Sequence, residues 1–236
     1  MIEGVRALTF DVFGTVVDWR SGVARDAAAI IGTHGVERDW GTFADRWRAL
    51  YQPSLERVRT GERPWTRLDD LHRDSLRQVL DEFGIHNLPP HELEHLNRAW
   101  HRLDPWPEVV EALGRLKMRF ILATLSNGNV SLTVNMAKRA RLPWDAVLGA
   151  EVAQAYKPLP AAYLTTARLL DCRPDECLMV ATHHHDLVAA RHCGFRTAYV
   201  HRPEEFGPAP KNDLPAEHGH DLVVDDFLQL AGTLGA

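Results

Sequence analysis

Four polar sites along the sequence could carry out covalent chemistry together. Each lies at or just after the end of a predicted strand: Asp11, the pair Ser126-Asn127, Lys157 and Asp186. Two carboxylates with a lysine between them suit a nucleophile and a base, because the ammonium group keeps the first carboxylate ionised while the second can position water. Structural alternatives exist, since Asn127-Gly128 is a common turn pair and Asp186 can cap a helix.

The first of these residues, Asp11, ends a short apolar run that starts at Leu8 and is followed by Gly14. Such a run is typical of a buried strand whose C-terminal end carries Asp11 into a loop. Ligands bind at that end of the strands in an open α/β sheet. The alternative, in which Asp11 caps a turn and Gly14 only lets the backbone bend, leaves a carboxylate at the end of an apolar strand unexplained.

The elements that must position these residues alternate along the second half of the chain. Strands are predicted at residues 120–125, 146–149, 177–181, 197–200 and 222–224. Helices are predicted at residues 108–118, 129–140, 160–170, 186–192 and from residue 225. This alternation predicts parallel strands joined by right-handed crossovers, so that polar residues at the strand ends meet at one edge of the sheet.

The stretch between residues 40 and 100 shows only helical periodicity. A further helix is predicted to begin at Ser21, as its N-cap, and to end near His34. Because no strand signal interrupts this part of the sequence, it predicts a helical module inserted after the first strand.

Together these elements predict an α/β fold with a Rossmann-like parallel sheet core, helices on both faces of the sheet and an inserted helical cap. The core is predicted to consist of residues 1–16 and 104–236, and the cap of residues 17–103. The cap leaves the core beside Asp11, so it can cover the strand ends.

Composition excludes several classes of function. Of the 236 residues, 45% are hydrophobic and 25% are charged, which is enough for a full-sized core. A net charge of −5 without a run of Lys and Arg argues against a nucleic-acid partner, and the lack of a long apolar stretch argues against a membrane partner, so we expect a cytoplasmic protein. Three cysteines favour a reducing compartment over a disulfide framework. Residues 204–220, which are polar and contain Pro and Gly, are predicted to form a surface loop.

Four motifs in order resemble those of the haloacid dehalogenase superfamily. They are Asp11-Val-Phe-Gly-Thr15-Val, Leu125-Ser126-Asn127-Gly128-Asn129, Tyr156-Lys157-Pro158, and Asp186 before Ala-Ala-Arg-His-Cys-Gly. Phosphatases of this superfamily have a second Asp two positions after the nucleophile, where this chain has Phe13, and the residues just before Asp186 add no second late carboxylate for Mg²⁺. The chain therefore resembles the L-2-haloacid dehalogenases, which implies a site without metal or cofactor.

The resemblance implies a displacement in two steps. Asp11 would attack the halogen-bearing carbon and form an aspartyl ester, and water would then attack the carboxyl carbon of Asp11 to leave a 2-hydroxy acid. Lys157 would keep Asp11 anionic, and Asp186 would orient or deprotonate the water.

The resemblance also implies residues that bind the substrate. Arg48 matches the cap arginine of the family and would hold the halide together with Asn127, while Thr15 and Ser126 would bind the substrate carboxylate. Tyr163 falls where the family has a site tyrosine. The alternatives are that Arg48 is a solvated charge on a helix and that Tyr163 packs against the sheet.

The triplet His183-His184-His185 departs from the family, which has an Asn three residues before the last Asp. His183 could replace that Asn or act as a base, because histidine titrates near neutral pH. We expect His183 to face the ester and His185 to line the halide side, in a tight pocket that could accept fluoride. A metal site is disfavoured, because the side chains of adjacent residues diverge.

These observations predict hydrolytic dehalogenation of short 2-haloacids, namely haloacetates, L-2-haloacids and fluoroacetate, to 2-hydroxy acids. The alternatives are a divergent phosphatase of the same superfamily and a relative that binds ligands without catalysis. The expected partner is a small-molecule haloacid, and a homodimer is the expectation from the family.

Overall fold

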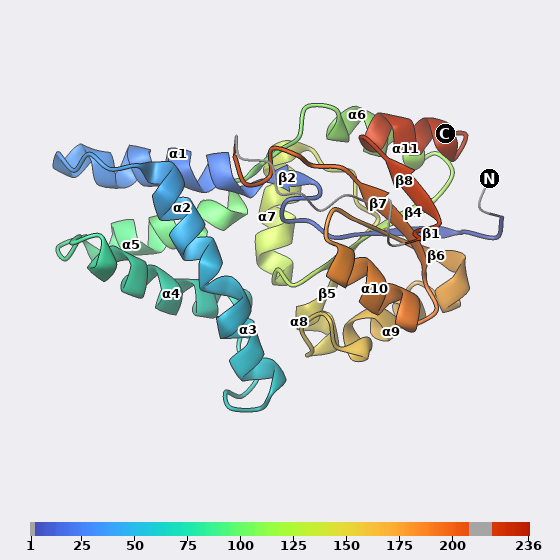
Figure 1. Cartoon of the computed structure of the whole chain (residues 1–236), viewed down its shortest axis with the longest axis horizontal. Coiled ribbons are helices and arrows are strands. Elements are labelled where there is room, and N and C mark those ends of the chain that lie inside the picture. The colour runs from blue at the N-terminus through green and yellow to red at the C-terminus, as the bar shows by residue number, and fades with distance from the viewer. Residues whose placement is uncertain (1–2, 208–218) are drawn as a thin grey trace.

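The computed structural model describes residues 3–207 and 219–236. Six strands within these residues form one sheet: β1 (Ala7–Phe10), β4 (Ile121–Ser126), β5 (Ala146–Gly149), β6 (Cys177–Ala181), β7 (Arg196–Val200) and β8 (Leu222–Val224). Their order is β5-β4-β1-β6-β7-β8, and each neighbouring pair is parallel (Figure 1). The β1 strand therefore lies inside the sheet with its C-terminal end between those of β4 and β6.

Helices cover both faces of this sheet (Figure 1). One face is covered by α6 (Val109–Leu116), α7 (Val130–Ala140) and α11 (Phe227–Thr233), and the other by α9 (Pro160–Leu169) and α10 (His184–His192). Leu8 and Phe10 pack in the first core and Ala7 in the second, as the alternation of side chains along a strand requires. The predicted α/β fold class is confirmed.

The residues between β1 and α6 are mainly helical and lie at the end of the sheet where Asp11 leaves β1. They form α1 (Trp19–Ile31), α2 (Trp40–Ala49), α3 (Tyr51–Arg59), α4 (Leu68–Glu82) and α5 (Pro90–Asn97), followed by a 3-10 turn at Arg98–His101. Two short strands, β2 (Val17–Asp18) and β3 (Asp104–Pro105), pair antiparallel where the chain enters and leaves this segment. The division into two domains at these positions stays a prediction.

An aromatic cluster joins the helical segment to the loop after β1. The Phe13 ring meets Trp100 edge-on at 5.7 Å between centroids, and Trp100 stacks on Trp19 at 6.2 Å. All three side chains are buried. Phe13, whose position carries a carboxylate in phosphatases, is here a packing residue.

Two predictions need correction. The N-cap of α1 is Asp18, whose side chain accepts a hydrogen bond of 3.0 Å from the backbone N–H of Ser21, so Ser21 lies inside the helix that it was expected to cap. In the predicted surface loop 204–220, Glu205 is only 3% exposed because its carboxylate pairs with groups beneath it. Residues 208–218 of that loop lie outside the described residues.

Within residues 3–207 and 219–236, no helix combines the length and the apolar character needed to cross a membrane.

Candidate active site

Polar side chains from several strand ends meet around one cavity of about 740 Å³. Asp11 follows β1, Asn127 follows β4, and Asp186 lies in the first turn of α10, which follows β6. Lys157 reaches the same cavity from the loop after α8 (Ala150–Ala153). The structure thus brings these residues together at one edge of the sheet, although Lys157 follows the short helix α8 and not, as predicted, the end of a strand.

Lys157 links the two aspartates. Its Nζ donates a hydrogen bond of 2.9 Å to Oδ1 of Asp11 and another to Oδ2 of Asp186. Burial alone would raise the pKa of Asp11, but Lys157 and His183 hold it well below its usual range. Burial alone would lower the pKa of Lys157, but Asp11 and Asp186 raise it above its usual range. The geometry therefore gives an ionised carboxylate beside a charged ammonium group in a largely dry site.

Asp186 has both carboxylate oxygens engaged by other side chains. Oδ1 accepts a hydrogen bond of 2.6 Å from the hydroxyl group of Tyr163, and Oδ2 accepts from Lys157. Burial and the Asp186 charge raise the pKa of Tyr163, which keeps its hydroxyl proton for this bond. These contacts suit a carboxylate that fixes Lys157, and a role for Asp186 in orienting or deprotonating water stays a prediction.

The hydroxyl groups of Thr15 and Ser126 form hydrogen bonds within the protein. Thr15 Oγ1 donates to Oδ2 of Asp11 at 2.8 Å and accepts from the backbone N–H of Thr182 at 3.0 Å. Ser126 Oγ accepts from the backbone N–H of Gly128 at 3.0 Å. Both residues are fully buried, and neither is among the described residues that line the cavity. Hydrogen bonds within the protein therefore engage both hydroxyl oxygens, and the expectation that Thr15 and Ser126 bind the substrate carboxylate stays a prediction.

Arg48 projects from α2 into the cavity lining. Its guanidinium carbon lies 4.2 Å from the centroid of the Tyr51 ring and 5.4 Å from that of Trp19, so both aromatic faces support it. Its Nη1 atom is buried and has no hydrogen-bond partner among the described residues. A buried N–H donor of this kind suits an anion.

Asn127 connects the cavity to the helical segment. Its Nδ2 donates to the Tyr51 hydroxyl at 3.0 Å, and its Oδ1 accepts from the backbone N–H of Lys157 at 2.9 Å. Asn127 therefore fixes the loop that carries Lys157 and supports the ring on which Arg48 rests.

The three histidines have different surroundings. His183 Nδ1 lies 3.2 Å from Oδ2 of Asp11, and its place beside an ester stays a prediction. His185 lines the cavity, and burial together with the neighbouring His183 lowers its pKa. His184 stacks on Tyr199 at 4.6 Å. No group of three or more His, Cys, Asp and Glu side chains in the described part of the chain is arranged to hold a metal ion.

Glu205 is a site residue that sequence reasoning missed. Its Oε1 lies 3.0 Å from Nε2 of His183 and accepts a hydrogen bond of 3.1 Å from Nε1 of Trp19. Burial alone would lower the pKa of His183, but Glu205 and Asp11 raise it to about 10. The one signal in the sequence is Phe206, an aromatic residue in a polar segment, whose ring meets Trp19 at 5.8 Å.

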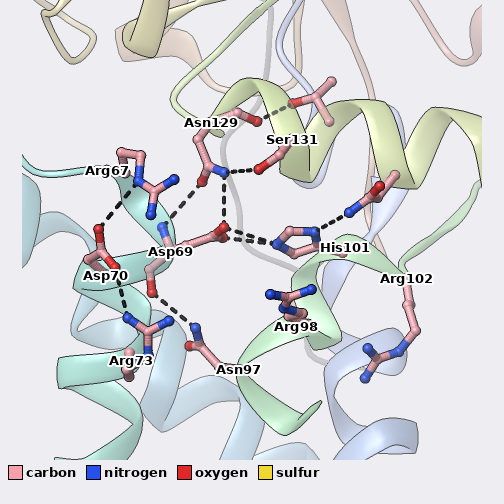
Figure 2. Close-up of polar contacts among 12 residues, drawn as sticks. Arg67, Asp69, Asp70, Arg73, Asn97, Arg98, His101, Arg102, Asn129 and Ser131 are labelled. Atoms are coloured by element: carbon pink, nitrogen blue, oxygen red, sulfur yellow. Dashed lines mark hydrogen bonds and ion pairs between the residues drawn. The ribbon is translucent and has the colours of Figure 1, made fainter. Parts of the chain in front are cut away.

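A second polar cluster anchors α4 to the loop that follows β4 (Figure 2). Asp69 accepts a hydrogen bond of 2.9 Å from Nδ2 of Asn129, and its own backbone N–H donates to Oδ1 of Asn129 at 3.2 Å. His101 Nε2 lies 3.0 Å from Oδ1 of Asp69, and the Asn97 side chain donates to the Asp69 carbonyl oxygen at 3.0 Å. Since Asn129 is two residues from Asn127, this cluster holds the helical segment next to the cavity.

The chain is similar to known proteins over most of its length. Residues 5–194 match the family model of haloacid dehalogenase-like hydrolases. The chain is 30% identical to (S)-2-haloacid dehalogenase 4A of Burkholderia cepacia over 89% of its own length and 90% of that protein's.

Two solved structures are similar over nearly the whole chain. One is the defluorinating L-2-haloacid dehalogenase Rha0230, with 46% identity, a TM-score of 0.94, and coverage of 98% of this chain and 96% of that one. The other is the L-2-haloacid dehalogenase PA0810, with 44% identity, a TM-score of 0.94, and coverage of 98% and 99%.

Proposed function

The chain belongs to the haloacid dehalogenase-like hydrolases, and from the arrangement of its cavity we propose that it hydrolyses the carbon–halogen bond of short 2-haloacids. The match to the family model confirms the family resemblance that the four sequence motifs indicate. The observation that supports the proposed reaction is the state of the Asp11 carboxylate, which is buried and has a pKa well below its usual range. Its Oδ1 lies 2.9 Å from Nζ of Lys157, at a cavity that Arg48 also lines. A carboxylate is a nucleophile at an alkyl carbon, and the released halide then needs a cation.

In the proposed first step, a carboxylate oxygen of Asp11 forms a bond to carbon 2 of the haloacid, and the carbon–halogen bond breaks with its electron pair leaving on the halide. Lys157 holds the carboxylate in place. Arg48 receives the halide, since its Nη1 donor has no partner among the residues described here. Asn127 supports this slot through Tyr51.

In the proposed second step, water attacks the carboxyl carbon of the Asp11 ester and releases a 2-hydroxy acid. His183 is our candidate for the base, because its Nδ1 faces Oδ2 of Asp11 at 3.2 Å. Asp186 and Tyr163 keep Lys157 in position during both steps.

The proposed substrates are L-2-haloacids and haloacetates, and we include fluoroacetate. The name of one relative supports fluoride as a leaving group, since that protein, 46% identical to this chain, is described as defluorinating. A hydrogen-bonding halide slot favours fluoride, which is the halide that accepts the strongest hydrogen bonds. Location in the cytoplasm and assembly as a homodimer stay predictions from the sequence.

The experiment is a single turnover with L-2-chloropropionate in ¹⁸O-water, without added Mg²⁺. We expect halide release and one ¹⁸O atom in the peptide that contains Asp11, because the water oxygen enters the carboxylate. Label found only in the product would rule out the aspartyl ester. Hydrolysis of a chromogenic phosphate with Mg²⁺, in the absence of halide release, would rule out dehalogenation.

A further inference from the structure

Glu205 is a buried carboxylate for which the two steps above give no role. It is 3% exposed and lines the cavity. An acid taken out of water is costly unless it is paired and hydrogen-bonded, so its partners indicate its role.

Three neighbours define where the Glu205 carboxylate lies. Its Oε1 accepts from Trp19 Nε1 at 3.1 Å and lies 3.0 Å from His183 Nε2. The carboxylate also rests on Gly14, where an added Cβ would lie 2.2 Å from Oε1. Only glycine leaves this space, and the φ of +86° at Gly14 favours glycine as well.

His183 therefore lies between two carboxylates. Nδ1 faces Asp11 and Nε2 faces Glu205, and a protonated imidazole can donate to both. Lys157 and Asp186, which pair with each other, line the same cavity as His183, and so do Arg48, Arg202 and Asp45. The His185 ring lies 5.7 Å from the His183 ring between centroids.

Formation of the ester changes this balance of charge. Esterified Asp11 carries no negative charge, so Glu205 is the carboxylate that remains in contact with His183. Nδ1 can then give up its proton and face the ester carboxyl carbon with a lone pair, while Nε2 keeps its proton in the hydrogen bond to Glu205.

We propose that Glu205 is the positioning residue that holds His183 in this tautomer and so makes His183 the general base for hydrolysis of the Asp11 ester. The inference rests on the dehalogenation proposed above. An acidic group that orients a histidine fixes both its tautomer and the direction of its free nitrogen.

Hydrolysis of the ester consumes one water molecule. The water oxygen adds to the carboxyl carbon of Asp11 while one water proton passes to Nδ1 of His183. The bond between that carbon and the alkyl oxygen then breaks, and Nδ1 returns the proton to the leaving oxygen, which gives the 2-hydroxy acid. The second water proton leaves Asp11 for solvent as its carboxylate pairs with Lys157 again.

The test uses Glu205→Gln, which keeps an acceptor for Nε2 but removes the charge. With L-2-chloropropionate, we expect E205Q to release its first equivalent of halide at the wild-type rate and to hydrolyse the ester about 10- to 100-fold more slowly. The alkylated enzyme then accumulates in intact-mass spectra, and kcat and KM fall together. Glu204→Gln is the matched control, because Glu204 is adjacent and exposed, and it should behave as wild type.

The pH profile separates this role from a structural one. Loss of the Glu205 charge lowers the pKa of His183 in the esterified enzyme, so the rising limb of the pH profile of kcat moves to lower pH in E205Q. Glu205→Asp keeps the charge and should retain the wild-type profile.

A second variant displaces the Glu205 side chain without replacing it. Gly14→Ala should also accumulate ester, whereas Gly4→Ala, with a similar φ of +84° and nothing within 4 Å, should not.

Two results would overturn the inference: an unchanged kcat and pH limb in E205Q, or an equal loss of halide release and ester hydrolysis without accumulated adduct. Either result leaves dehalogenation by the wild type intact. If the wild type itself releases no halide, the proposed function fails and the base role of His183 fails with it.

Discussion

Lys157 Nζ lies 2.9 Å from Oδ1 of Asp11 and also contacts Asp186, so two buried carboxylates share one buried cation. The Lys157 residue is 7% exposed, which leaves little water to replace it. The three groups therefore form one charged unit whose stability depends most on its single cation.

Lys157→Met should destabilise the protein more than Asp11→Asn. Loss of the ammonium group leaves two buried carboxylates without it, which should lower the free energy of unfolding by about 3–5 kcal/mol. Loss of the Asp11 charge leaves the pair of Lys157 and Asp186 intact. Both variants should lose dehalogenation. Urea unfolding at pH 7 measures the difference, and equal stabilities would contradict the shared-cation arrangement.

His183 should make stability depend on pH in the alkaline range. Its pKa is raised from 6.5 to about 10 in the folded protein, so its contribution to the free energy of unfolding is fully present below pH 6.5 and is lost as the pH rises toward 10. The slope from one proton is at most about 1.4 kcal/mol per pH unit. Urea unfolding between pH 6 and 10 should show this component in wild type and not in His183→Asn. The exposed His91 supplies the control, because His91→Asn should retain the wild-type slope.

Arg48 and Arg46 lie on the same helix and should behave differently. Arg48 lines the cavity with a buried donor, so Arg48→Ala should lower kcat by about 10²- to 10³-fold through loss of halide stabilisation. Arg46 pairs with Glu82 at 2.6 Å at the surface, so Arg46→Ala should leave kcat unchanged and cost less than about 1 kcal/mol of stability. Halide release measured with both variants decides the matter, and equal losses would argue against the halide role.

Asp69 should contribute far more stability than its neighbour Asp70. Asp69→Ala removes the acceptor of Asn129 and His101 beneath α4, a loss of about 1–3 kcal/mol for each buried group left unpaired. Asp70 pairs with Arg73 at 2.8 Å near the surface, so Asp70→Ala should change stability by less than about 1 kcal/mol (Figure 2). Thermal unfolding compares the two, and similar melting temperatures would show that the Asp69 cluster is not an anchor.

Local patterns in the sequence predict much of the fold and the centre of the site. Apolar runs that end in Asp11 or Asn127 are strands whose ends meet, because parallel strands share one edge. The same rule brings Asp186 to that edge, whereas Lys157 reaches it from the loop after α8. The helical periodicity of the inserted segment accounts for the placement of Arg48 on a helix.

Contacts between segments that are far apart in the sequence cannot be predicted from such local patterns. The bond between His183 and Glu205 joins two loops, and the polar residues around Glu205 favour exposure. The hydroxyl groups of Thr15 and Ser126 have nearby backbone and side-chain partners, and residue type alone does not say whether a hydroxyl bonds to the protein or to a substrate. The N-cap of α1 shows the same limit on a smaller scale, because Asp18 and Ser21 both suit that position.

The pairing of β2 with β3 also bears on how such an enzyme can diversify. The chain leaves and re-enters the sheet-forming part through two strands that lie side by side, so the helices between them begin and end at one place. Insertions, deletions or exchange of that segment between relatives then leave the register of the sheet unaltered. Selection can therefore change the surroundings of Arg48, the proposed halide slot, through one contiguous stretch of gene, while Asp11 and Lys157 belong to the part of the chain that forms the sheet.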